Sequence, residues 1–341
     1  MKLDLCDFGI NIAGYVAPCH CKCNHCLLGC GENILSKVDY NKFREVALKF
    51  KDWKIDHNIE VCFYPYNCAE FEEYKDSIDV NRQLDFQAWW YMNINGTEMR
   101  CGKELENWLD GLFKHGISCI NISWFGDETF HDAFVNRKGY FGYLFEVLET
   151  AGRIGLTVNN MLYLLKSNLS MLYDLYNKLN CVSKKSGKYF SLLDYLGSSR
   201  KRMNEFISLE NYEALPDFIK NTISRNKYKT EAEWLDIINT NRFVPPTKRV
   251  VNIMVTPENV DELLQLTAGE IVGRAHSIDI KLQAAIPGFK YLADNYGSSS
   301  SNILFDFRSL IWYLTEKHFN ANPSLDKSLM YNPTAISCMW K

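Results

Sequence analysis

The sequence predicts an α/β protein, a partial (β/α)6-type barrel followed by a C-terminal α/β extension. Short apolar runs alternate along the chain with longer segments whose apolar residues recur at helical spacing. Roughly six such β–α units fit into about the first 200 residues, which is the pattern of a parallel sheet with helical crossovers. A cluster of cysteines directly follows the first apolar run, where barrel enzymes place their chemistry.

The first two thirds of the chain contains the clearest elements. The spacing predicts helices over 39–53, 102–115 and 139–154. Apolar runs predict strands over 9–16, 59–64, 86–94, 118–124, 156–164 and 189–193. Pro65 is expected to end the second of these strands, and a loop is expected over 197–202.

The remainder of the chain has a weaker pattern. It predicts a strand over 250–255, helices over 257–266 and 309–318, a loop over 296–302 and an irregular tail from residue 320. We therefore expect a core barrel over residues 1–215. The extension over 216–341 is expected to close the barrel or to bind substrate.

Composition limits the classes of protein and partner. Of 341 residues 47% are hydrophobic and 23% are charged, as in ordinary globular proteins, and the formal net charge is −3. No basic field favours a nucleic acid partner. No apolar stretch approaches the length of a membrane-spanning helix, and no secretory signal is visible. The sequence predicts a soluble, cytoplasmic protein without a membrane partner.

The cysteines are the main chemical signal. Five of the twelve lie close together: Cys19, Cys21, Cys23, Cys26 and Cys30. In a reducing compartment such a cluster favours metal ligation over disulfides. Cys19, Cys23 and Cys26 have the spacing CxxxCxxC, which lets three thiolates hold three irons of a [4Fe–4S] cluster and leaves the fourth iron open.

A zinc site is the alternative for the same segment. Cys21, Cys30, His20 and His25 offer further ligands in tetrahedral combinations. A structural zinc site usually draws on two separated ligand pairs, and no second CxxC pair follows. The spacing therefore favours the cluster, and Cys21 and Cys30 receive no role.

This CxxxCxxC spacing resembles that of the radical S-adenosylmethionine (SAM) superfamily. The resemblance implies that the open iron binds SAM and that one electron cleaves SAM to a 5′-deoxyadenosyl radical, which abstracts hydrogen from a substrate. It extends over roughly residues 5–215. Further matching stretches are INGT at 94–97, INISWFGDETFHD at 120–132, AGRIGL at 151–156 and SLLDYLGSSRKR at 191–202.

The chain departs from the family pattern at two places. The residue before the third cysteine is usually aromatic and hydrophobic in the family, and here it is His25. The family carries a Gly-Gly-Glu motif after the second strand, and here residues 66–70 read YNCAE, so that only Glu70 matches.

The resemblance implies a SAM site at the strand ends. Glu70 would hold the SAM amino group, Ser123 the ribose or carboxylate, and Arg200 or Arg202 the carboxylate. Asn95 belongs to the matching turn after the third strand. An ordinary surface glutamate, a common Asn-Gly turn and a solvated basic face are the structural alternatives.

Other candidates have a structural interpretation beside a functional one. Cys68 is the candidate catalytic hydrogen-donor thiol, against a partly buried spectator thiol. The His131-Asp132 pair is interpreted as a helix cap or a buried pair. Five aromatic residues near strand ends are interpreted as core in preference to a pocket lining: Trp89, Trp90, Tyr91, Trp124 and Phe125.

The favoured hypothesis is a radical SAM enzyme with one [4Fe–4S] cluster that modifies a peptide or protein. It resembles the peptide-modifying branch, yet beyond residue 181 it has only Cys338 and so lacks that branch's cysteine-rich C-terminal domain. The resemblance implies a flavodoxin- or ferredoxin-type electron donor. Two alternatives stay open: a radical SAM enzyme acting on a small metabolite, and a non-catalytic, zinc-stabilised binding module.

Overall fold

Two parallel sheets form the centre of the molecule. The computed structural model describes residues 6–17, 19–26, 36–67, 71, 73–84, 91–94, 98–182, 186–240, 242 and 248–330. One sheet has the strand order β8–β1–β2, and the other has β3–β4–β5–β6. The strands are β1 (Cys6–Tyr15), β2 (Glu60–Tyr66), β3 (Tyr91–Asn93), β4 (Cys119–Trp124), β5 (Thr157–Leu164), β6 (Gly187–Leu192) and β8 (Lys248–Val255).

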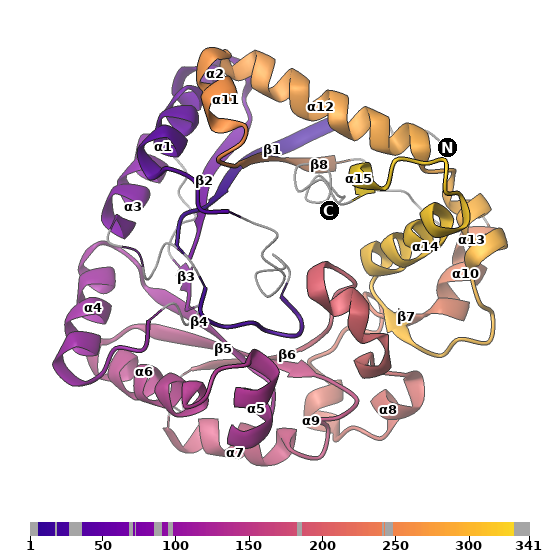
Figure 1. The fold of residues 1–341 in the computed structure, drawn as a ribbon. Coiled ribbons are helices and arrows are strands. Elements are labelled where there is room, and N and C mark those ends of the chain that lie inside the picture. The colour runs from indigo at the N-terminus through magenta and orange to yellow at the C-terminus, as the bar shows by residue number, and fades with distance from the viewer. Residues whose placement is uncertain are drawn as a thin grey trace.

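Helices lie outside these strands. Figure 1 shows the strands around the inside of an open ring, with α1, α3, α4, α6 and α7 on its outer side. The first seven helices are α1 (Tyr40–Leu48), α2 (Phe50–His57), α3 (Tyr74–Gln83), α4 (Gly102–Lys114), α5 (Glu128–Val135), α6 (Tyr140–Ile154) and α7 (Leu172–Val182). This parallel α/β arrangement is the partial barrel that the sequence predicts.

The chain after β6 adds helices and a small antiparallel pair, most of them in the extension. After the 3₁₀ segment η3 (Gly197–Glu205), the helices are α8 (Leu209–Glu213), α9 (Asp217–Lys220), α10 (Glu231–Asn239), α11 (Val260–Gln265), α12 (Ala268–Ala285), α13 (Phe289–Tyr296), α14 (Phe307–Ala321) and α15 (Lys327–Met330). Strands β7 (Lys229–Thr230) and β9 (Leu304–Phe305) pair with each other. None of the helices in the described ranges is long and apolar enough to cross a bilayer.

The burial of side chains alternates along β4 and shows which face of the strand points to the inside of the ring. Ile120, Ile122 and Trp124 are at most 1% exposed, and the Trp124 ring lies 5.0 Å from that of Phe145 on α6. These side chains therefore face the helices. Since successive residues of a strand point to opposite faces, the partly exposed Ser123 faces the inside.

A row of asparagines crosses that inner face. The Asn121 side-chain amide donates a hydrogen bond to the Asn93 side-chain oxygen at 3.0 Å, and the Asn159 side-chain amide donates to the Asn121 side-chain oxygen at 3.1 Å. The three residues are also register partners on β3, β4 and β5. Gly187 continues the row on β6, where a Cβ atom would lie only 2.9 Å from the Asn159 side-chain oxygen. The inner wall at this level is thus polar.

Local signals set the ends of α6. Gly139 precedes it with φ 77°, and Gly155 ends it with φ 97°, a region that favours glycine. The carboxylate of Asp132 accepts from the backbone N–H groups of Gly139 and, at 2.8 Å, Phe141. The interpretation of Asp132 as a cap is confirmed, and its neighbour His131 is fully buried.

Three local predictions were wrong. The helix expected over 39–53 is two helices, α1 and α2, joined at Lys49. Pro65 lies within β2, opposite Gly14 of β1, instead of ending the strand. Within the described residues β2 is an edge strand, where a missing N–H is tolerated. The loop expected over 197–202 forms the 3₁₀ segment η3.

Strand β8 joins the extension to the barrel. It pairs in parallel with β1, with Asn252 opposite Asn11 and Met254 opposite Ala13. The sequence predicts this strand but not its partner. Strand β8 therefore lies after residue 215 in the sequence but in the same sheet as β1 and β2. The predicted domain boundary at residue 215 stays a prediction.

Candidate active site

The cysteine loop, residues 19–26, follows the carboxyl end of β1 and is held on the side of α5. Lys22 donates its backbone N–H to the Val135 carbonyl at 2.9 Å, and Asn24 donates to the Phe134 carbonyl at 3.1 Å. Ser198 of η3 donates to the Cys26 carbonyl at 2.9 Å. The loop is therefore fixed at the strand end by two separate elements of the barrel.

Two side chains at neighbouring strand ends hold the start of the loop. The Tyr15 hydroxyl accepts a hydrogen bond from the Cys19 backbone N–H at 2.6 Å. Asn67, which follows β2 with φ 65°, donates its side-chain amide to the Ala17 carbonyl at 2.8 Å. Asparagine tolerates this left-handed conformation better than most residues, which explains its place here.

The loop brings its thiols together. Cys21 is 2% exposed, and its thiol is hydrogen-bonded to those of both Cys19 and Cys23. The hydrogen bond with Cys21 is the main cause that raises the pKa of Cys19, followed by burial, and Cys26 adds to it. For Cys21 the hydrogen bond with Cys19 lowers the pKa, but the one with Cys23 and burial outweigh it and raise the pKa to about 12.

The donor set of this loop fits an iron–sulfur cluster. Thiolates are the ligands that such clusters use, and metal binding displaces the thiol protons. Among the described residues, no three Cys, His, Asp or Glu side chains are arranged to hold a single metal ion. A four-iron cube takes its thiolates from a wider space than one ion does, and Cys19, Cys23 and Cys26 all lie on this one loop.

His25 packs as an aromatic residue. Its ring lies 4.4 Å from that of Phe125, 5.2 Å from Tyr163 and 5.7 Å from Phe134. Burial lowers the pKa of His25 to about 3, and nearby His131 adds to the effect, so the ring is neutral. His25 stands where a hydrophobic aromatic residue is expected from the resemblance. Its ring still packs against aromatic side chains.

Both histidines have a buried nitrogen that lacks a partner. In the described part of the chain, neither Nδ1 of His25 nor Nε2 of His131 has a hydrogen-bond partner. The other ring nitrogen of His131 faces the Phe125 backbone N–H at 3.3 Å. Burial lowers the pKa of His131 to about 4.

The prediction that aromatic residues near the strand ends belong to the core is confirmed for Phe125 and Trp124, which are 1% and 0% exposed.

Ser123 lies at the end of β4 on the inner face and shares a hydrogen bond with the Tyr163 hydroxyl of β5. Burial is the main cause that raises the pKa of Tyr163 to about 12, and Asp194 adds to it. Because the Tyr163 ring also contacts His25, these hydroxyls lie on the same side of the barrel as the cysteine loop.

Arg200 and Arg202 both lie on η3, which contacts the loop through Ser198, and both already have partners. Arg200 donates to the Gly197 carbonyl at 3.0 Å, and its guanidinium lies 3.9 Å from the Glu316 carboxylate. Arg202 donates to the Asn24 side chain at 2.7 Å and so ties η3 to the loop. Their role toward a SAM carboxylate stays a prediction.

A pair of carboxyl groups near Tyr163 has no signal in the sequence. Asp194, just after β6, is hydrogen-bonded to Asp306, the N-cap of α14. Burial is the main cause that raises the pKa of Asp194, Asp306 adds to it, and Arg308 and Lys227 oppose it. The two aspartates come from distant parts of the chain, so no local pattern announces the pair.

Several predicted residues lie outside the described ranges. These are Cys68, Glu70, Asn95 and Cys30, together with the aromatic residues Trp89 and Trp90. Their predicted roles stay predictions.

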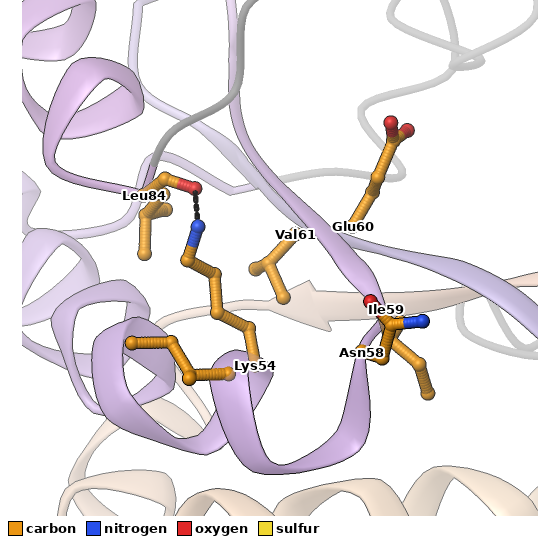
Figure 2. A pocket seen from close by; sticks show the side chains of 7 residues that line it. Lys54, Asn58, Ile59, Glu60, Val61 and Leu84 are labelled. Carbon is orange, nitrogen blue, oxygen red and sulfur yellow. Dashed lines mark hydrogen bonds between the residues drawn. The ribbon is translucent and has the colours of Figure 1, made fainter.

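A cavity of about 300 Å³ lies elsewhere. Lys54, Glu60 and Val61 are among its lining residues, and Lys54 donates to the Leu84 carbonyl at 2.6 Å across it (Figure 2). Glu60 and Val61 begin β2, whereas the cysteine loop follows the carboxyl end of the parallel strand β1. This cavity is therefore separate from the candidate active site.

Comparisons with known proteins give a match of fold. No family model and no curated protein matches the sequence. Among solved structures, native anSMEcpe with bound AdoMet and Kp18Cys peptide has a TM-score of 0.51 at 13% identity, over 95% of this chain and 99% of that one. Native anSMEcpe with bound AdoMet has a TM-score of 0.49 at 14% identity, over 94% and 99%.

A longer protein is also similar in part. SuiB of Streptococcus suis, bound to its precursor peptide SuiA, has a TM-score of 0.48 at 11% identity. The alignment covers 77% of this chain, which spans 62% of the length of SuiB. With the cysteine loop at the carboxyl end of β1 in a partial parallel barrel, the chain shares the fold of anSMEcpe over nearly its whole length.

Proposed function

We propose that this protein is a radical SAM enzyme that modifies a peptide or protein. The observation that carries the proposal is the CxxxCxxC loop at the carboxyl end of the first strand of a partial parallel barrel. Chemistry in such barrels lies at that end of the strands. The match of fold to anSMEcpe, whose structure holds AdoMet and a peptide, supports the substrate class.

Cys19, Cys23 and Cys26 would hold the [4Fe–4S] cluster, and the strand ends around them would hold SAM. When bound, the two supply one-electron cleavage of SAM to a 5′-deoxyadenosyl radical. Five residues are proposed to bind SAM: Glu70, Asn95, Ser123, Arg200 and Arg202. A flavodoxin- or ferredoxin-type protein is the proposed electron donor, and the cytoplasm the proposed location.

Residues of this chain would shape the site around that chemistry. The rings of Phe125, Phe134 and Tyr163 pack around His25 of the loop and would exclude water there. Ser123 and Tyr163 present hydroxyl groups at the strand ends. Burial and nearby Asp306 raise the pKa of Asp194, and the Asp194 carboxyl group lies close enough to influence Tyr163. We propose that these groups orient a polar substrate.

The test is anaerobic reconstitution of the full chain with iron and sulfide. We expect about four irons per chain, an electron paramagnetic resonance signal that SAM perturbs after reduction, and 5′-deoxyadenosine as product. The Cys19→Ala/Cys23→Ala/Cys26→Ala variant should lose all three. A Cys101→Ala/Cys181→Ala variant, which changes two exposed cysteines, should retain them.

Other outcomes separate the alternatives. A colourless chain that binds zinc and no iron would contradict the proposal and favour a zinc-stabilised module. A cluster that is indifferent to SAM would contradict the enzymatic part of it. Cleavage of SAM that a small metabolite stimulates, and that peptides encoded near the gene do not, would move the substrate to the metabolite class.

A further inference from the structure

An aromatic ring lies at one end of the asparagine row on the inner face of the barrel. Phe190 of β6 is 7% exposed and packs against Tyr176 of α7, so it faces outward. Side chains alternate along a strand, which turns the next residue, Tyr189, inward, where it is 51% exposed. A Cβ atom on Gly187 would lie 2.7 Å from the Tyr189 ring and 2.9 Å from the Asn159 side-chain oxygen. The missing side chain at Gly187 therefore lets the ring approach Asn159.

The hydrogen bonds of the row run in one direction and leave polar atoms over. The Asn159 amide donates to Asn121, and the Asn121 amide donates to Asn93. The Asn93 amide donates in turn to the Tyr64 hydroxyl at 3.3 Å. A carboxamide has two N–H donors and an oxygen that can accept twice. Within the described ranges each of the three asparagines donates only one hydrogen bond, and the Asn159 oxygen accepts none. Asn159 thus keeps both a donor and an acceptor.

This combination of groups is complementary to another carboxamide. A carboxylate could accept from the row but has no proton to donate to the Asn159 oxygen, and an ammonium group could donate but not accept. An amide does both, and its planar group can lie against the exposed ring of Tyr189. The hydrogen bonds along the row hold the asparagine side chains in place before anything binds, so that little rotamer freedom is lost on binding.

The row lies next to the proposed SAM site. Asn121 and Ser123 are two residues apart on the same face of β4, which corresponds to about 7 Å along the strand. Ser123 is one of the residues proposed to bind SAM. A group bound to the row would therefore lie on the inner wall directly beside that site.

We propose that the asparagine row and Tyr189 form a substrate subsite that binds an uncharged carboxamide side chain, that of asparagine or glutamine, in the peptide substrate. The inference rests on the proposed function and names a feature of its substrate. The row recognises the side chain by hydrogen bonds in both directions at Asn159, and Tyr189 covers one face of the amide.

The experiment measures the binding of defined peptides to the reconstituted full chain with SAM, by calorimetry. The probes are capped pentapeptides, acetyl-Gly-Ala-X-Ala-Gly-amide, in which X is Asn, Gln, Asp or Glu. They share one backbone, so their ratios isolate the central side chain. At least one amide probe should bind about tenfold more tightly than its acid counterpart, the scale of one hydrogen bond.

Three variants locate this preference. Asn159→Ala should reduce the ratio between amide and acid probes to less than about twofold. Tyr189→Ala removes a half-exposed ring and should weaken the amide probe roughly three- to tenfold. Asn177→Ala, at an exposed position on α7, is the control and should behave as the parent.

Each result decides the matter. Amide and acid probes that bind equally to the parent, or that do not bind, overturn the inference. A row that only holds the sheet together would make Asn159→Ala less stable in urea and leave the ratio unchanged, which also overturns it. If Asn159→Ala does not fold, Tyr189→Ala decides, and unchanged amide binding there overturns the subsite.

Iron content and 5′-deoxyadenosine are measured in the same samples. A parent chain that binds no iron overturns the proposed function and this inference with it. A parent chain that cleaves SAM but does not prefer the amide probes overturns the inference alone.

Discussion

The Arg308 guanidinium at the start of α14 lies 3.4 Å from the carboxylate of Asp194, from which it is separated by 114 residues of sequence. This contact crosses from the extension to the end of β6 and accompanies the hydrogen bond between Asp194 and Asp306. A residue of the extension thus contacts the end of a barrel strand, and the predicted role of the extension in closing the barrel stays a prediction.

The carboxyl pair makes stability depend on pH. Because the pKa of Asp194 is raised in the folded state, its contribution is fully present below the unfolded pKa and is lost as pH rises through the folded pKa. The side chain in Asp194→Asn cannot ionise, so this variant should avoid that loss. We expect the parent to lose on the order of 1 kcal/mol more unfolding free energy than the variant between acidic and neutral pH. Urea unfolding at a series of pH values measures it. Asp56→Asn, at an exposed position, should follow the parent, and parallel curves for the two variants would refute the prediction.

Cys21 tests which thiols are ligands. If Cys19, Cys23 and Cys26 hold the cluster, Cys21→Ala should keep about four irons per chain at a stability cost of about 1 kcal/mol. Each single alanine variant of the other three should lose at least about half of the iron. Iron and sulfide analysis after reconstitution measures this. Loss of iron in Cys21→Ala, with Cys19→Ala unaffected, would reassign the ligand set.

Asp132 is expected to matter for stability and not for chemistry. Its carboxylate accepts from the backbone N–H groups of Gly139 and Phe141 at the start of α6. Asp132→Ala should cost about 1–2 kcal/mol of unfolding free energy, and Asp132→Asn less. Iron content per folded chain should not change. Stable Asp132→Ala protein that no longer cleaves SAM would instead show a catalytic role.

Ser123 is expected to bind SAM through its hydroxyl. Ser123→Ala should weaken SAM binding roughly three- to tenfold, the scale of one hydrogen bond. The Tyr163 hydroxyl beside it has its pKa raised to about 12 and keeps its proton, so the effect should be equal at pH 7 and pH 9. Equilibrium binding to the reconstituted protein measures it. Ser118→Ala, just before the amino end of the same strand, is the control, and equal losses in both would exclude a specific contact.

Local sequence patterns predicted the region from β4 to β5 well. Alternating burial around Trp124 and glycines at both ends of α6 are properties of short segments, so they are visible in the sequence. The prediction for Pro65 failed because a proline is compatible with an edge strand, and the edge is a property of the sheet. The cysteine loop follows the first strand, as the sequence predicts, whereas Cys68, Glu70 and Asn95 lie outside the described residues.

By itself, the sequence determined the α/β alternation, the position of the cysteine loop after the first strand and the candidate ligands on it. These depend on spacing within a few residues. Only the tertiary structure decided that β8 lies beside β1, that Asp194 meets Asp306, and that Arg202 bonds the Asn24 side chain of the cysteine loop. Each of these joins segments distant in sequence, and such contacts follow from how the whole core packs.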